Sequence, residues 1–292
     1  MRRNVFGFHG ILITFFSLFA VGLQAEKARA NFIPFSPATP RHEVISQDEI
    51  GDCACGPCAI FNAFQFGDPA LNNLAAALPG NVPADKVRAL IQQYGGKPSV
   101  ITPRQPRYLA SGGMWEDDLV PFINDCLKTD NVPPVRGDRL DLQGNETGPA
   151  CLRRVYHELN HSLSAGFPPI VNLQAYTGHK NFFHRYWKWM DGHFVAVVAV
   201  QNTLPPNASK FSMWVADSQS GRILEVTVCA DQSRQSSSLV RSQTKRSGKV
   251  PVQITRDYPC LAIQSPKLEG ILEGPAASST QSICVIDYAV HR

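Results

Sequence analysis

The order of hydrophobic and polar residues divides this chain into a helical first half and a strand-rich second half. Helical patterning covers residues 58–66, 71–78, 84–94, 115–127 and 151–164. From residue 168 onward, apolar runs bounded by turn residues predict strands at 169–176, 192–200, 211–217 and 222–228, which we expect to form an antiparallel meander. Helices followed by a sheet predict an α+β fold.

Other stretches lack this regular patterning. Residues 131–150 are typical of a loop, and residues 233–249 of a mobile linker or long surface loop. Residues 178–190 carry Phe182, Phe183, Tyr186, Trp187 and Trp189, so we expect an aromatic loop that covers either the core or a substrate cleft. Two strand-like pieces follow at 250–254 and 283–289.

The N-terminal residues have the layout of a cleavable signal peptide. Met1-Arg2-Arg3 is positively charged, residues 11–23 are apolar, and Ala28-Arg29-Ala30 or Leu23-Gln24-Ala25 offers a cleavage site. The apolar region is shorter than a membrane span, and no later segment is long and apolar enough to form one. We therefore expect a signal peptide at 1–30, a main domain at 31–230, a linker and C-terminal extension at 231–292, and a secreted or periplasmic location.

Charge and cysteine content narrow the function classes. A net charge of +4 on 292 residues gives no reason to expect a nucleic-acid partner or an anionic membrane. All eight cysteines follow the signal peptide, so in an oxidising compartment several of them are candidates for disulfides, although the sequence does not say which.

Three cysteines, Cys53, Cys55 and Cys58, precede the apolar run at 59–64, and three kinds of chemistry use such a cluster. Cys55-Gly56-Pro57-Cys58 has the spacing of a redox dithiol, but the polar residues 47–52 stand where a thioredoxin has a buried strand. A zinc site lacks the usual second pair of ligands. A thiol on the first turn of a helix is favoured as the thiolate, which makes a cysteine nucleophile the preferred interpretation.

A cysteine nucleophile needs a base, and the second half of the chain supplies one. His193 begins an apolar strand and Asp217 ends the next one, so antiparallel pairing can bring both side chains to one end of the sheet. Asp217 would orient the imidazole and stabilise its charged form. Gln47 is placed to donate its amide to an oxyanion, alongside the backbone N–H of the nucleophile.

These motifs resemble the papain-like cysteine peptidase superfamily, and within it the bacterial peptidases that cleave double-glycine leaders from bacteriocins. The shared features are Cys-Gly-Pro before a buried helix, Gly-His before an apolar strand, and Ala-Asp-Ser before a turn. The resemblance implies a papain-like α+β fold at 31–230, in which an N-terminal helical half with the nucleophile helix packs on a C-terminal antiparallel sheet. It also implies the catalytic set Cys55, His193, Asp217 and Gln47, a peptide or protein substrate, and no cofactor or metal.

The choice of nucleophile has alternatives. The register of papain-type enzymes would favour Cys58, and the distance from Gln47 would favour Cys53. We prefer Cys55, because Gly56-Pro57 directly after it forms a turn and presets the first helical residue. Two rival functions remain open: a catalytically silent binding domain stapled by disulfides, and a thiol–disulfide oxidoreductase that uses Cys55 and Cys58.

Overall fold

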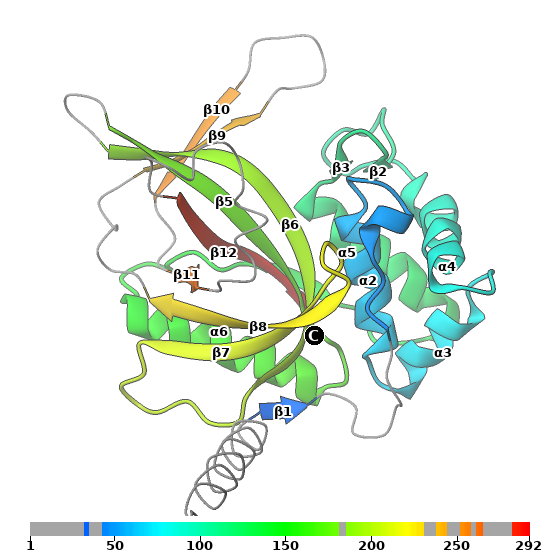
Figure 1. The fold of residues 1–292 in the computed structure, drawn as a ribbon, viewed down its shortest axis with the longest axis horizontal. Helices are drawn as coiled ribbons and strands as arrows, with labels where there is room; N and C mark the ends of the chain where they lie inside the picture. The colour runs from blue at the N-terminus through cyan, green and yellow to red at the C-terminus, as the bar shows by residue number, and fades with distance from the viewer. Residues whose placement is uncertain are drawn as a thin grey trace, which may run out of the picture.

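The computed structural model describes residues 32–34, 43–180, 185–230, 238–243, 252–257, 261–264 and 282–292. Five α-helices lie within these residues, close to the predicted positions (Figure 1): α2 (Cys55–Gln65), α3 (Pro69–Ala77), α4 (Pro83–Leu90), α5 (Glu116–Leu127) and α6 (Gly148–Ser164). A π-helical turn, Ile91–Gly95, continues α4, and short 3-10 turns occur at Gln47–Glu49 and Lys128–Asp130. None of the described helices is long and apolar enough to span a bilayer.

The strands form a closed antiparallel barrel of six members: β5 (Ile170–Lys180), β6 (Arg185–Gln201), β7 (Lys210–Asp217), β8 (Arg222–Ala230), β11 (Leu261–Gln264) and β12 (Ser282–His291). Their order is β6-β5-β12-β11-β8-β7, and β7 pairs again with β6, which closes the barrel (Figure 1). The papain-like fold expected from the sequence is therefore wrong, because this barrel does not fit it.

Two long-range pairings account for the difference. β12 comes from the end of the chain and inserts between β5 and β11, whereas the sequence pattern left this region outside the main domain. β11 pairs with β12 on one side and with β8 on the other, so β11 and β12 join β5 to β8, the two outer strands of the meander, and close it into a barrel. Local hydrophobic patterning indicates where strands occur but carries little information on which distant strand lies beside them.

Shorter strands extend this sheet at its periphery. They are β1 (Phe32–Pro34), β4 (Arg136–Arg139), β9 (Ser238–Gln243) and β10 (Val252–Asp257), and a separate hairpin joins β2 (Tyr108–Leu109) to β3 (Gly113–Met114). β4 lies inside the predicted loop 131–150, and β9 inside the predicted linker 233–249, so both predictions are wrong at these positions.

The aromatic loop expected at 178–190 is instead largely strand, because β5 runs to Lys180 and β6 begins at Arg185. Trp187 is fully buried and pairs across the hairpin with Gly178. Phe182 and Phe183 lie outside the described residues.

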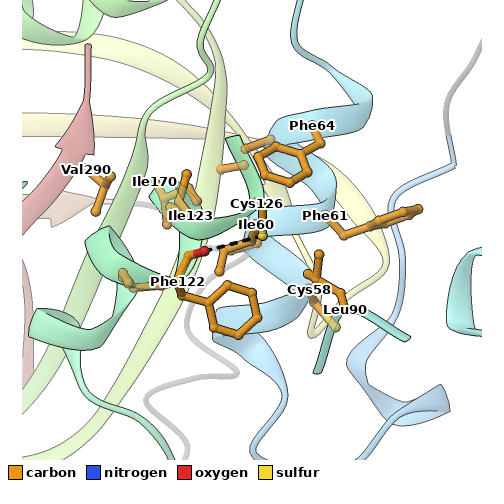
Figure 2. Close-up of a cluster of buried hydrophobic side chains, with 14 of the residues drawn as sticks. Cys58, Ile60, Phe61, Phe64, Leu90, Phe122, Ile123, Cys126, Ile170 and Val290 are labelled. Carbon is orange, nitrogen blue, oxygen red and sulfur yellow. Dashed lines mark hydrogen bonds between the residues drawn. The ribbon is translucent and has the colours of Figure 1, made fainter. Parts of the chain in front are cut away.

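Two hydrophobic cores flank the barrel wall. The helical core lies between α2, α5 and the outer face of the barrel, where Phe64, Phe122 and Ile123 meet Ile170 and Val290 (Figure 2). The barrel core fills the interior and is covered by α6; it includes Leu152, Val155, Leu159, Val195, Val197, Val215 and Val226. Alternate residues of β6 face the two cores, which explains why its sequence is apolar almost without interruption.

Candidate active site

Cys55 is the first residue of α2, at the end of the helix that faces a cleft. Pro57 lies in the first turn, where a proline sacrifices no helical hydrogen bond. Among the described residues no side chain caps this turn, so its backbone N–H groups and the helix dipole are available to a negative charge. A negative charge that develops on the Cys55 sulfur would therefore lie at the positive end of the helix dipole.

His193 and Asp217 meet beside Cys55. The strands β6 and β7 are paired through Ala196 and Ala216, and this register brings His193 Nε2 to 2.7 Å from Asp217 Oδ1. Both side chains are buried, and the Cys55 sulfur lies near enough to the His193 ring to raise its pKa. Since Nε2 faces the carboxylate, Nδ1 is the ring nitrogen left for the sulfur.

Opposing effects set the protonation states of His193 and Asp217. Burial lowers the pKa of His193, but hydrogen bonds with Asp217 and Cys55 and their negative charges raise it to about 9. Burial raises the pKa of Asp217, but its hydrogen bond with His193 and those from the backbone N–H groups of Gln219 and Ser220, each 3.1 Å, leave it below the ordinary value. At neutral pH the ring is therefore imidazolium and the acid is a carboxylate.

Gln47 is held beside the same cleft by three hydrogen bonds of its own and by one from the nearby residue Ile45. Its backbone N–H donates to the carbonyl of Ser218 at 2.8 Å, and the Ser218 hydroxyl donates to Gln47 Oε1 at 3.2 Å. Gln47 Nε2 donates to the carbonyl of Asp52 at 3.2 Å, and the Ile45 N–H, two residues upstream, donates to Asn62 Oδ1 on α2. One amide proton of Nε2 is left for a ligand, because the Asp52 bond uses only one.

The other two cysteines of the cluster occupy different settings. Cys58 is completely buried in the helical core (Figure 2), and burial raises the pKa of its thiol well above the ordinary range. Burial also raises the pKa of Cys53, with nearby Cys55, Asp52 and Asp191 adding to the rise, although the Gly113 N–H donates to the sulfur. The structure therefore places Cys55, rather than Cys53 or Cys58, where its sulfur acts on the charge of His193.

The structure also bears on the three alternatives for the cysteine cluster: a disulfide-stapled domain, a metal site and a redox dithiol. Cys53, Cys55 and Cys58 are free thiols in the described part of the chain, whereas a disulfide-stapled domain would pair at least some of them. Across the described residues, no group of three or more His, Cys, Asp or Glu side chains is arranged to hold a metal ion. The redox alternative keeps its Cys55 and Cys58 spacing but gives no role to the pair of His193 and Asp217.

The cleft has a volume of about 380 Å³ and lies between the start of α2, the segment 112–116, the first half of β5 and the middle of β6. Gln47, Cys55 and His193 line it together, so the predicted nucleophile, base and amide donor open onto one space. Asp217 lies behind His193 and is not part of the lining.

Several lining residues were not found from the sequence. Glu116, Asn172 and Gln174 are buried polar residues at the floor of the cleft, and Trp115 stands beside Glu116. Asn172 and Gln174 interrupt the apolar run of a strand, which is the one sequence signal that could have indicated a site there. Trp189 also lines the cleft, in agreement with one of the two roles considered for the aromatic segment.

Comparison with known protein families, with curated proteins and with solved structures finds no match to this chain. The resemblance to papain-like peptidases thus rests on the short motifs around Cys55, His193 and Asp217 alone.

Proposed function

We propose that this chain is a thiol-dependent hydrolase, a cysteine peptidase that cleaves peptide bonds in a peptide or protein substrate. The observation that carries the proposal is the line of contacts from Cys55 to His193 to Asp217 at the wall of a cleft. A nucleophile, a base and an orienting acid in this sequence of contacts are the parts that covalent acyl transfer requires.

The reaction uses each group in turn. The Cys55 thiolate attacks the scissile carbonyl, and the oxyanion is stabilised by Gln47 Nε2 and the Cys55 backbone N–H. Collapse of this intermediate breaks the C–N bond as the His193 imidazolium donates its proton to the leaving amine, which leaves a thioester. Neutral His193 then takes a proton from water, the resulting hydroxide attacks the thioester, and the departing thiolate and imidazolium are restored.

Asp217 acts through His193 and does not touch the substrate. Its carboxylate fixes the orientation of the ring and stabilises the imidazolium between the two chemical steps. The raised pKa of His193, about 9, supports this role because the ring must hold a proton before it can deliver one.

The proposed secreted or periplasmic location depends on the signal peptide expected at residues 1–30. Residues 1–30 lie outside the described residues, and we keep the signal peptide and a secreted or periplasmic enzyme as part of the proposal. An exported peptidase meets peptide or protein substrates outside the cytoplasm.

A thiol-directed covalent peptidase inhibitor tests the proposal. We expect one equivalent to modify Cys55 in the native protein, as located by peptide mass mapping, and modification to become much slower in His193→Ala. Cys53→Ser and Cys58→Ser serve as matched controls and should keep the labelling.

Three results would overturn the proposal. Labelling that is unchanged in His193→Ala would show that His193 is not the base. Labelling at Cys53 or Cys58 would show that Cys55 is not the nucleophile. A native protein that resists labelling but reduces insulin disulfides would instead be a thiol–disulfide oxidoreductase.

A further inference from the structure

The cleft in front of Cys55 has an acidic character that the rest of the chain does not share. Asp52, Glu116 and Asp191 line it, and no Lys or Arg is among the described residues that do so. The whole chain, by contrast, carries a net charge of +4. An acidic cleft in a basic protein favours ligands of positive charge.

The two exposed carboxylates, Asp52 and Asp191, line the cleft near Cys53. Asp52 and Asp191 are near enough to Cys53 for their charges to act on its thiol. The Asp191 carboxylate is oriented by the next residue of β6, because Oδ1 accepts from the Gly192 N–H at 2.8 Å. These charges therefore face the space that a substrate side chain next to the scissile bond would enter.

The floor of the cleft provides a second, independent feature. Asn172 is almost completely buried, and its Nδ2 donates to Glu116 Oε2 at 2.9 Å, while its Oδ1 has no hydrogen-bond partner within the described residues. A buried carbonyl oxygen without a donor is costly, and a ligand N–H group would satisfy it. The unpaired atom is an acceptor, so the missing partner is a donor.

Glu116 is paired with Arg139, whose guanidinium also lies 3.7 Å from a carboxylate oxygen of Asp287. The charge that the cleft offers to a ligand therefore comes mainly from the exposed carboxylates of Asp52 and Asp191.

We propose that this cleft selects substrates with a basic side chain, lysine or arginine, adjacent to the scissile bond. Asp52 and Asp191 attract the cationic end at the mouth, and Asn172 Oδ1 accepts a hydrogen bond from it at the floor. The indoles of Trp115 and Trp189 line the same space and provide aromatic surface for the aliphatic stem and for cation–π contact. This specificity rests on the peptidase function proposed above.

Matched fluorogenic peptides test it. The peptides differ only in arginine or citrulline, its neutral counterpart of nearly equal shape, at each position that flanks the scissile bond. We expect at least one position where arginine raises kcat/KM about tenfold, the size expected of two partly exposed charge pairs. In Asp52→Asn/Asp191→Asn the ratio of kcat/KM for the arginine peptide to kcat/KM for the citrulline peptide should fall to about twofold or less.

The control variant removes the same number of negative charges outside the cleft. Asp130→Asn/Glu225→Gln alters two exposed acids outside the cleft and should keep the preference. Raising the salt concentration should weaken the preference in the native enzyme, because both carboxylates are exposed.

The outcomes separate this inference from the peptidase function. Cleavage with equal rates for arginine and citrulline at every position would overturn the specificity and leave the peptidase intact. A preference for arginine that survives in Asp52→Asn/Asp191→Asn would overturn the roles of those two residues. Absence of any Cys55-dependent cleavage or labelling would overturn the peptidase function, and the specificity with it.

Discussion

Replacing Asp217 by asparagine should move the alkaline limit of activity. The proposed mechanism needs a protonated His193 to release the leaving amine, so kcat/KM of the native enzyme should fall as the pH rises through about 9. Asparagine keeps the size of the side chain but removes the negative charge 2.7 Å from His193 Nε2.

The size of the shift follows from the forces on His193. Its pKa lies about 2.5 units above the ordinary 6.5, which corresponds to about 3 kcal/mol in favour of the imidazolium. Without Asp217, burial still lowers the pKa and only Cys55 opposes it. The descending limb should therefore move down by about two pH units, to about 7 or below, and turnover should fall by about 10²- to 10⁴-fold.

The assay is kcat/KM for a peptide substrate between about pH 5 and pH 11, fitted for the descending limb. Asp138→Asn is the matched control, because Asp138 Oδ2 lies 2.8 Å from Nε2 of another histidine, His291, outside the cleft. Asp138→Asn should keep the native profile. If Asp217→Asn kept the native turnover and the native pH of the descending limb, the assignment of Asp217 to the mechanism would be refuted.

Three other predictions follow from the same structure. Gln47→Ala should lower kcat about 10²- to 10³-fold by removing an oxyanion donor, whereas Ser218→Ala, which only anchors Gln47, should cost less; equal losses would contradict this division. His193, whose pKa rises on folding, contributes stability that is complete below pH 6.5 and is lost as the pH rises to about 9, so the melting temperature should fall across this range in the native protein and stay flatter in His193→Gln. A chain that ends before β12 (Ser282–His291) should lose cooperative melting, because this strand lies between β5 and β11; a cooperative transition with a native-like melting temperature would show that the barrel closes without it.

Local features of the site could be predicted from the sequence. The Gly-Pro pair after Cys55 marks the start of a helix, and Asp217 ends β7 as predicted, whereas His193 lies in the middle of β6 because this strand begins earlier than its apolar pattern indicates. The hydrogen bond between His193 and Asp217 follows from antiparallel pairing of neighbouring strands, which short connections make easy to anticipate. The helices of the first half were predicted for the same local reason.

The barrel and the cleft could not be predicted in this way. β12 lies beside β5 although about a hundred residues separate them in the chain, and no period in the sequence records such a pairing. The hairpin of β5 and β6 around Trp187 has the sequence pattern of a loop, because its aromatic residues are interspersed with polar ones. Glu116, Asn172 and Gln174 each belong to a regular element, so only the assembled fold shows that they share a cleft.

The most direct test of the account is the mass of the intact enzyme trapped during turnover. Protein mixed with a peptide ester and quenched in acid should carry one acyl group as a hydroxylamine-sensitive thioester on Cys55, and Cys55→Ser should not form this thioester. Native enzyme that hydrolyses the ester with no acyl group on Cys55, or with the group on another residue, would contradict the claim that this thiol is the nucleophile.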